Sequence, residues 1–377
     1  MTIKLHRMSG GSFTNWIKLL WENGGIDRKY LLRALSVSIF RFLSIPMIIY
    51  ENIRFGKKIE NFSIKESPIF IIGHHRSGTT YLHNLMIQDE NFGYISLLQC
   101  LAPNHFLVSE KLLKLLTKIT LPKTRPMDNV SLSIDSPEEE EFAMSNISVY
   151  SGFHLKHFPK KMLDIFTKYV LFNGTSQQIK ECWKNQYIKV LKKASFSMNS
   201  KKLILKTPEN MARIKLLLEM FPDAKFIHIY RNPYNVYLST KNLYLKDLAI
   251  HTFQNINIKD IEKNIFFFYK ELMQRFFVEK TLIPSQNFIE IKFEDFEANP
   301  LKELEKVYYE LKLPGFQIAE EYFRKYIETQ KEYKKNEYLL DDKTQKKIYQ
   351  NWKFTIEKWK YDVPDNLELQ VRNNIQE

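Results

Sequence analysis

A glycine-bounded polar loop is the part of the sequence whose residue types point most directly to chemistry. Gly73 and Gly78 bracket four residues, and the loop lies between an apolar run and a helix-like pattern that opens with Thr79 and Thr80. The backbone N–H groups of such a loop can turn inward, and the positive end of the following helix attracts an anion. The sequence therefore predicts a phosphate cradle.

The residues inside the loop favour one phosphate chemistry over another. The glycine spacing matches a nucleotide triphosphate-binding loop, but Thr79 occupies the position of the lysine that reaches the β- and γ-phosphates. Arg76 lies inside the turn instead, and a guanidinium fork suits a planar or tetrahedral oxyanion. We therefore expect an oxyanion held without metal, and a nucleotide kinase or NTPase becomes the less favoured alternative.

Two further segments end in side chains that can bind an anion. Residues 225–230 have the pattern of a buried strand and lead to Arg231, with Ser239 eight residues later, and another apolar run leads to Lys206. Donors at strand ends gather at the carboxyl edge of a parallel sheet, where ligands bind in open α/β folds. Arg231 and Ser239 are therefore candidates for a second phosphate clamp.

Taken together, these motifs resemble those of sulfotransferases that use 3′-phosphoadenosine 5′-phosphosulfate (PAPS). The residues 75–80 resemble the family's 5′-phosphosulfate loop, the strand ending in Arg-Asn-Pro resembles its 3′-phosphate motif, and Lys206-Thr207-Pro208 resembles a string of its glycan-modifying members. The resemblance covers about residues 66–300. It implies an α/β fold with a P-loop-like central parallel sheet flanked by helices, and an enzyme that transfers a sulfuryl group to a hydroxyl.

The resemblance implies a role for each matched residue. Sulfuryl transfer resembles phosphoryl transfer, in which cations and positioning do most of the work. Arg76 and Lys206 would stabilise the transferring sulfonate and the departing phosphate oxygen. Arg231 and Ser239 would hold the 3′-phosphate of PAPS and of its product, 3′-phosphoadenosine 5′-phosphate. The cofactor-binding loop would consist of His75, Arg76, Ser77, Gly78, Thr79 and Thr80.

The general base departs from the family's pattern. Cytosolic members carry a histidine two residues after the strand-end lysine, where this chain has Pro208, and other members carry a glutamate near the position of Gln99. The acidic run 138–141 resembles a string of bacterial members, although an acidic helix start is the alternative interpretation. The candidates for the base are therefore His105, Glu139 and Glu140.

Composition favours an intracellular protein with a large core. The 377 residues are 44% hydrophobic. Cys100 and Cys182 have no metal-ligand spacing, and residues 1–15 lack the apolar stretch of a cleavable signal, so we expect a reduced, cytoplasmic protein. The net charge of +13 attracts nucleotides, nucleic acid and anionic lipid alike. Because the sequence has no zinc-finger spacing or RNA-binding motif, we expect no nucleic-acid partner.

Apolar patterns divide the chain into three regions. We expect a helical N-terminal extension over residues 1–66, a sulfotransferase α/β core over 67–300, and a helical C-terminal region over 301–377 that packs on the core. The strands expected within the core cover residues 68–73, 202–206, 225–230 and 288–293.

Two apolar segments bear on the acceptor. Residues 31–50 are interrupted by Arg33, Arg41 and Pro46, which favours a helix packed on the core, with an interfacial helix at a membrane surface as the alternative. Residues 94–108 carry no charge, which favours a small-molecule hydroxyl on a hydrophobic body such as a sterol, a phenol or a lipid. A glycan sulfotransferase and a non-catalytic nucleotide-binding protein are the alternatives. The sequence has no feature that indicates a particular oligomeric state.

Overall fold

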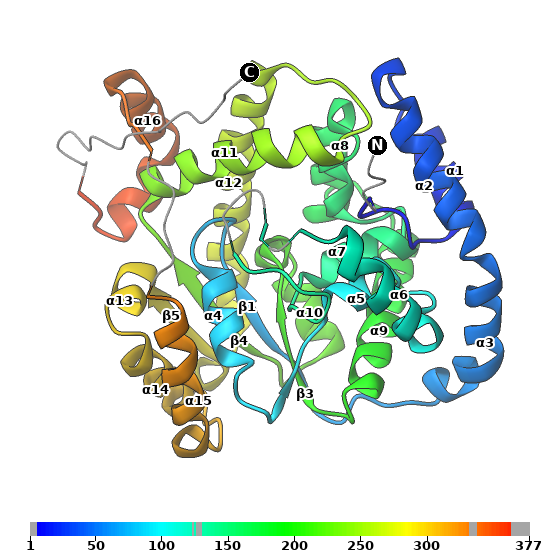
Figure 1. The fold of residues 1–377 in the computed structure, drawn as a ribbon. Coiled ribbons are helices and arrows are strands. Elements are labelled where there is room, and N and C mark those ends of the chain that lie inside the picture. Colours follow the sequence, from blue (N-terminus) through cyan, green and yellow to red (C-terminus); the bar gives the residue numbers. More distant parts are fainter. Residues whose placement is uncertain (1–5, 123, 126–129, 332–337, 363–377) are drawn as a thin grey trace.

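A parallel sheet forms the centre of the molecule (Figure 1). The computed structural model describes residues 6–362 apart from 123, 126–129 and 332–337. In this part of the chain the sheet has five strands in the order β2-β3-β1-β4-β5. The strands are β1 (Ile69–Ile72), β2 (Phe92–Gly93), β3 (Lys202–Lys206), β4 (Lys225–Tyr230) and β5 (Phe288–Lys292). The predicted fold class is confirmed.

The central strand, β1, fixes the relative positions of its two neighbours. All four of its residues are buried, as expected for a parallel strand with both faces covered. Ile71 is in register with Lys206 on β3, and Ile72 is in register with His228 on β4. The carboxyl ends of β3, β1 and β4 therefore lie side by side, and the residues that follow them meet at one edge of the sheet.

Four helical segments at the N-terminal side form a column on one flank of the molecule (Figure 1). Pro46 lies in the first turn of the last of them, where its missing N–H is tolerated, so the interruption seen in the sequence does not end the helical column. Among the described residues, the helix over 28–60 is long and apolar enough to cross a membrane by length and composition. The segments are α1 (Phe13–Glu22), η1 (Arg28–Tyr30), α2 (Leu31–Leu43) and α3 (Ile45–Glu60).

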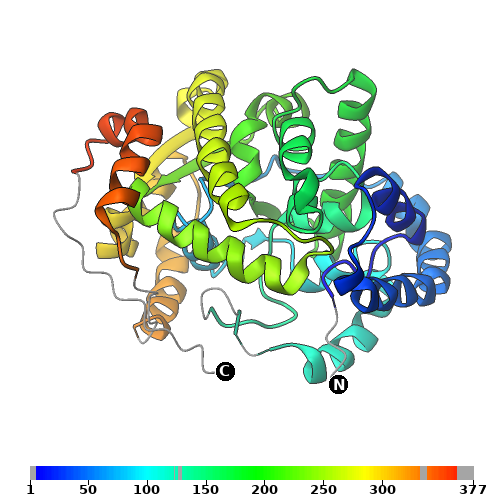
Figure 2. The same cartoon turned by 90° about the horizontal axis from the view of Figure 1, so that it is seen from above.

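The remaining helices cover the faces of the sheet and both ends of the molecule. Figure 2 shows the N-terminal column and α16 at opposite ends. These helices are α4 (Thr79–Met86), α5 (Leu97–Leu101), α6 (Phe106–Thr120), α7 (Glu140–Ile147), α8 (Met162–Ile165), α9 (Gln177–Ser197), α10 (Ile214–Met220), α11 (Pro233–His251), α12 (Ile258–Glu279), α13 (Phe293–Ala298), α14 (Pro300–Glu310), α15 (Phe316–Thr329) and α16 (Asp342–Lys358). Short 3₁₀ turns include η2 (Gly152–Lys156) and η5 (Pro208–Ala212).

One hydrophobic core joins the flanking regions to the sheet. It extends from Met8 and Trp16 near the N-terminus to Trp352 on α16. The Trp352 ring stacks on Tyr269 of α12 with ring centroids 3.7 Å apart, so α16 packs on the core. The division into three regions stays a prediction, because a shared core does not mark boundaries between them.

Candidate active site

The loop after β1 bends over the start of α4. Gly78 has a φ of 99°, and a Cβ at this position would lie 2.1 Å from the Phe293 ring, so both the backbone and the packing require glycine. Arg76 also has a positive φ, of 71°. No side chain caps the N-terminus of α4 among the described residues, and Thr79 and Thr80 line a cleft. The first N–H groups of α4 are therefore available to an anion at this edge of the sheet.

An ion pair lies at the wall of the cleft beside the loop, with Glu139 as the member that lines the cleft. Lys206, at the end of β3, is 3% exposed, and its Nζ lies 2.6 Å from Oε1 of Glu139, the residue that precedes α7. Burial acts to raise the pKa of Glu139, but the positive charges of Lys206 and Lys156 outweigh it and hold the pKa below its usual value. Glu139 is thus a carboxylate that faces the cleft in its charged form.

A second carboxyl group lies behind this pair, at a position the sequence analysis did not single out. Glu209, on η5, is 3% exposed, and its Oε1 lies 3.8 Å from Nε2 of His75. Burial, together with the nearby charges of Glu139 and Glu141, raises the pKa of Glu209 to about 7. Burial also lowers the pKa of His75 well below its usual value, which favours the neutral imidazole.

The residues predicted to form a phosphate clamp lie close to one another and to the loop. Arg76 Nε donates to Ser239 Oγ over 2.8 Å, and Arg231 Nη1 donates to the Arg76 carbonyl over 3.3 Å. The Arg231 guanidinium lies 4.4 Å from the centroid of the Phe293 ring, and in the described part of the chain its buried Nε has no hydrogen-bond partner. A partly buried guanidinium with an unused donor is a suitable partner for a phosphate oxygen. The residues present therefore fit a 3′-phosphorylated nucleotide.

The cleft between the ion pair and the clamp combines charged and apolar walls. Asp247 is buried and pairs with Arg7 at 3.3 Å and with Lys156 at 3.6 Å, so part of the positive charge is neutralised within the wall. The residues that line the cleft come from the N-terminal segment, the loop, the start of α4, the residues before α7, η2, η5 and α11, among other segments. They are Arg7, His75, Arg76, Thr79, Thr80, Arg125, Glu138, Glu139, Phe153, Lys156, Pro208, Leu243 and Asp247.

Three predicted features are not brought to this cleft. Glu140 is fully buried, and its Oε1 accepts hydrogen bonds from the Tyr187 hydroxyl at 3.0 Å and from Asn210 Nδ2 at 2.6 Å. His105 is buried beside Ser109. The uncharged segment 94–108 packs mainly in the core and contributes none of the described lining residues, so its apolar character says nothing about the acceptor.

Ser77, a predicted phosphate ligand, uses its side chain within the loop. Its Oγ donates to the His74 carbonyl over 2.8 Å, and the side chain is almost completely buried. This hydrogen bond stabilises the turn. Ser77 therefore has a role in shaping the cradle, while Thr79 and Thr80 are the hydroxyl-bearing residues of the loop that line the cleft.

A cradle, an ion pair and a clamp at the carboxyl edge of one parallel sheet are characteristic of a P-loop-like group transferase. The chain belongs to the sulfotransferase family, because residues 68–317 match the sequence model of that family. Membership makes the protein a transferase and implies a PAPS-type sulfate donor. The predicted family is thereby confirmed, and the kinase and non-catalytic alternatives lose their support.

Relatives with assigned activities and solved structures agree with this assignment. Omega-hydroxy-beta-dihydromenaquinone-9 sulfotransferase Stf3 of Mycobacterium bovis and of Mycobacterium tuberculosis is 30% identical over 354 residues, which cover 94% of this chain and 90% of the relative. The crystal structure of sulfotransferase STF9 from Mycobacterium avium has a TM-score of 0.65 at 16% identity, covering 93% and 96% of the two chains. STF1 from Mycobacterium tuberculosis gives a TM-score of 0.60 at 16% identity, covering 83% and 86%. These two structures share the fold.

Proposed function

We propose that the protein transfers a sulfuryl group from PAPS to the hydroxyl of a hydrophobic small molecule, a lipid alcohol above all. The ion pair between Lys206 and Glu139 carries this proposal, because it holds a cation against a carboxylate that lines the cleft beside the phosphate cradle. The relative Stf3, whose name gives a hydroxylated menaquinone as its substrate, supports a lipid acceptor. Phe153 and Leu243 supply apolar surface in the cleft wall.

The proposed reaction assigns a task to each side chain of the cleft. PAPS supplies the sulfuryl group when it is bound and leaves as 3′-phosphoadenosine 5′-phosphate. Lys206 stabilises the negative charge that grows on the departing phosphate oxygen, and its turn toward that oxygen releases Glu139 from the ion pair. Glu139 then accepts the proton of the attacking hydroxyl as the new sulfur–oxygen bond forms.

The clamp binds the opposite end of the nucleotide. Arg231 and Ser239 hold the 3′-phosphate, and the hydrogen bond from Arg76 to Ser239 gives Arg76 a place in the same clamp. Arg76 also lines the cleft, so we assign it to both phosphate ends of the donor. Thr79, Thr80 and the N–H groups at the start of α4 bind the 5′-phosphate.

We also propose that the enzyme acts in the cytoplasm, at the surface of a membrane. A lipid acceptor requires access to a bilayer surface, so we propose a peripheral contact with a membrane. Cys100 and Cys182 are both free thiols, which supports a reducing, cytoplasmic compartment.

Incubation with radiolabelled PAPS and a panel of acceptors tests the function. The panel contains isoprenoid and long-chain alcohols, sterols, phenols and glycans. We expect label to enter the lipid alcohols. Transfer to glycans alone would contradict the hydrophobic acceptor. A protein that binds the nucleotide but transfers label to none of these compounds would show that the acceptor belongs to none of the classes in the panel.

A further inference from the structure

The outer face of α2 and α3 exposes an apolar stripe. Six residues define the stripe, and their side chains are between 49% and 80% exposed. They recur at spacings of three, four or seven positions, so they lie on one side of the helical column. Monomeric proteins rarely expose a continuous apolar patch of this kind without a partner. The six residues are Leu32, Leu35, Ile39, Phe42, Ile49 and Ile53.

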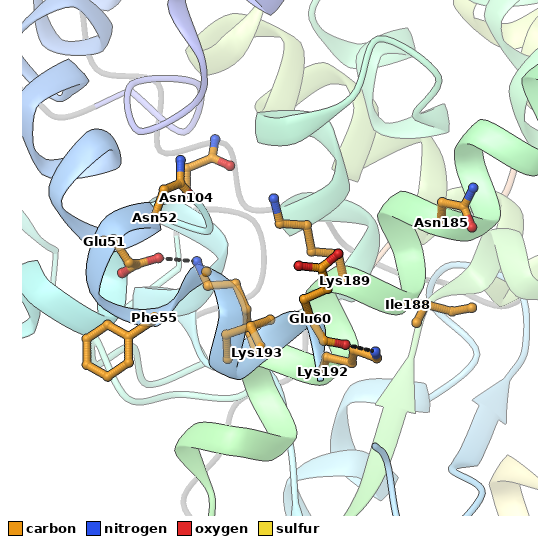
Figure 3. Close-up of a pocket in the computed structure, with 12 residues that line it drawn as sticks. Glu51, Asn52, Phe55, Glu60, Asn104, Asn185, Ile188, Lys189, Lys192 and Lys193 are labelled. Carbon is orange, nitrogen blue, oxygen red and sulfur yellow. Dashed lines mark hydrogen bonds and ion pairs between the residues drawn. The ribbon is translucent and has the colours of Figure 1, made fainter. Parts of the chain in front are cut away.

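The opposite face of the same helices is tied to the protein body through polar contacts. Arg41 is fully buried and donates to the carbonyls of Met8 and Ser12. Figure 3 shows Glu51 of α3 directed toward Lys193 of α9, with which it forms a buried ion pair, at the edge of a pocket of about 580 Å³. The column is thus fixed along its length on this side.

The column has one exposed apolar face and one face bonded to the protein body, and this limits how it can contact a membrane. A helix that spans a bilayer would place Arg41 and Glu51 at membrane depth and separate them from their partners, at a high cost in free energy. A helix that lies flat inserts only its outer face into the headgroup and acyl boundary. The contacts of Arg41 and Glu51 are compatible with the second arrangement alone.

The charges around the stripe identify its partner. Exposed basic residues stand at both ends, Arg28 and Lys29 before it and Lys57 and Lys58 after it. Of the acids in residues 27–60, Asp27 pairs with Lys160 and Glu51 with Lys193, and Glu60 is the exposed one, at the end of α3, so the basic residues outnumber it. Two copies of the chain paired along the stripe would bring these basic ends together in either orientation. Anionic headgroups complement both ends. We propose that the apolar stripe docks flat on a lipid bilayer that carries anionic headgroups.

Two neighbouring features support the same surface. Helix α1 packs beside α2, and its Trp21 is 89% exposed. Tryptophan is enriched where proteins meet the membrane interface. Arg41 also links the column to the cleft, because it bonds the carbonyl of Met8, the residue next to Arg7 of the cleft wall. The inference rests on the proposed function for its purpose, since a lipid acceptor would reach the cleft from this bilayer.

Sedimentation of the full chain with vesicles tests the docking without any sulfuryl transfer. The vesicles contain phosphatidylcholine with or without phosphatidylglycerol. We expect the protein to sediment with the anionic vesicles, to be released by carbonate, and to lose roughly tenfold or more in affinity in the double variant Leu35→Glu/Ile39→Glu. The matched control, Ile318→Glu/Leu282→Glu, changes two residues that are 75% and 51% exposed elsewhere and should bind as wild type does.

Three results would overturn the docking proposal. They are an absence of binding to either vesicle, equal binding by the Leu35→Glu/Ile39→Glu variant, and resistance to carbonate extraction, which would indicate a spanning helix. Dimers in analytical ultracentrifugation that this variant abolishes, with no vesicle binding, would assign the stripe to a second copy instead. Nucleotide binding is measured in parallel. Because the stripe lies outside the cleft, failure of the docking proposal should leave nucleotide binding intact, whereas failure of the sulfotransferase assignment should abolish it.

Discussion

Lys206 Nζ and Glu139 Oε1 lie 2.6 Å apart, so the cation and the base proposed for the reaction share one ion pair. Each residue reaches this position from a different element, Lys206 from the end of β3 and Glu139 from the residue before α7. Their contact makes the ionisation of the base depend on the catalytic lysine. Substitution of one residue is therefore expected to change the behaviour of the other.

Substitution Lys206→Ala should lower turnover about a hundredfold or more, because it removes a charge that stabilises the transition state. It should also raise the pKa of Glu139, since burial then acts with less opposition. The base must be deprotonated, so the acid limb of the pH–rate profile should move to higher pH. Lys206→Arg, which keeps the charge, is the control, and an unmoved acid limb in Lys206→Ala would exclude Glu139 as the base.

The pair Glu139→Gln and Glu140→Gln compares two adjacent glutamates with different surroundings. Glu139→Gln should lower turnover by about two to four orders of magnitude, the range for loss of a general base, with little change in melting temperature. Glu140 lies outside the cleft, so Glu140→Gln should keep turnover within a few-fold and lower stability through its buried hydrogen bonds. The reverse pattern in steady-state kinetics and thermal melts would assign the base to Glu140.

Arg231→Ala should weaken the binding of 3′-phosphoadenosine 5′-phosphate by roughly 2–3 kcal/mol, as expected for loss of a charge-assisted hydrogen bond. It should also remove most of the preference over the nucleotide that lacks the 3′-phosphate. Calorimetry with both nucleotides measures this preference. Arg275→Ala, on α12, is a matched control that should bind both as wild type does. A variant at Arg231 that keeps the full preference would show that Arg231 has a structural role.

Glu209→Gln should change how stability depends on pH. The folded-state pKa of Glu209 is about 7, above the ordinary 4.5, so the folded protein binds this proton more tightly than the unfolded chain. The free energy of unfolding therefore falls as pH rises from about 4.5 to about 7. Glutamine mimics the protonated acid, so the variant should gain stability relative to wild type over this window, on the order of 3 kcal/mol at its upper end. Urea unfolding at several pH values measures it.

The control for this experiment is Glu219→Gln. Glu219 is 41% exposed and pairs with Lys184 at the surface, so its substitution should leave the pH dependence as in wild type. Parallel stability curves for wild type and Glu209→Gln would mean that the Glu209 carboxyl titrates in its ordinary range.

Binding of 3′-phosphoadenosine 5′-phosphate should not require metal, because Thr79 occupies the position of the triphosphate-binding lysine and arginines supply the charge. Calorimetry in excess chelator should give the same affinity as in buffer with Mg²⁺. Binding that disappears with chelator, or a preference for ATP with Mg²⁺, would contradict the proposed donor site.

The sequence predicted those parts of the fold that depend on local patterns. β1, β3, β4 and β5 are short and rich in apolar residues, and their bounds agree with the expected ones within one residue. β2 covers two residues, too few to show an alternation. Segment 94–108 illustrates the limit of composition, because a buried core segment and an apolar pocket wall have the same lack of charge.

The candidate site was predictable where a motif is continuous in the chain. The loop, Lys206 and Arg231 each follow a strand, which places them at one edge of the sheet. Glu209 could not be singled out, since its position beside His75 depends on how η5 turns after β3. Arg41 looked like an interruption of an apolar helix, and only the tertiary structure shows that it faces backbone carbonyls inside the protein.

The place of β1 between its neighbours has a consequence for which donors can be recognised. Lys206 ends the strand on one side, and Arg231 follows the strand on the other. Adjacent strands lie about 4.8 Å apart, so two strand spacings, about 10 Å, separate β3 from β4 across the sheet. Arg231 also lies four residues further along the strand direction than Lys206, because Ile71 is in register with both Lys206 and Ile227. The hydrogen-bond ladders hold the strands in this register, so the sheet fixes the starting positions of the two cations. Selectivity for a nucleotide with two separate anionic groups would then be a property of the backbone, insensitive to changes in the acceptor side of the cleft.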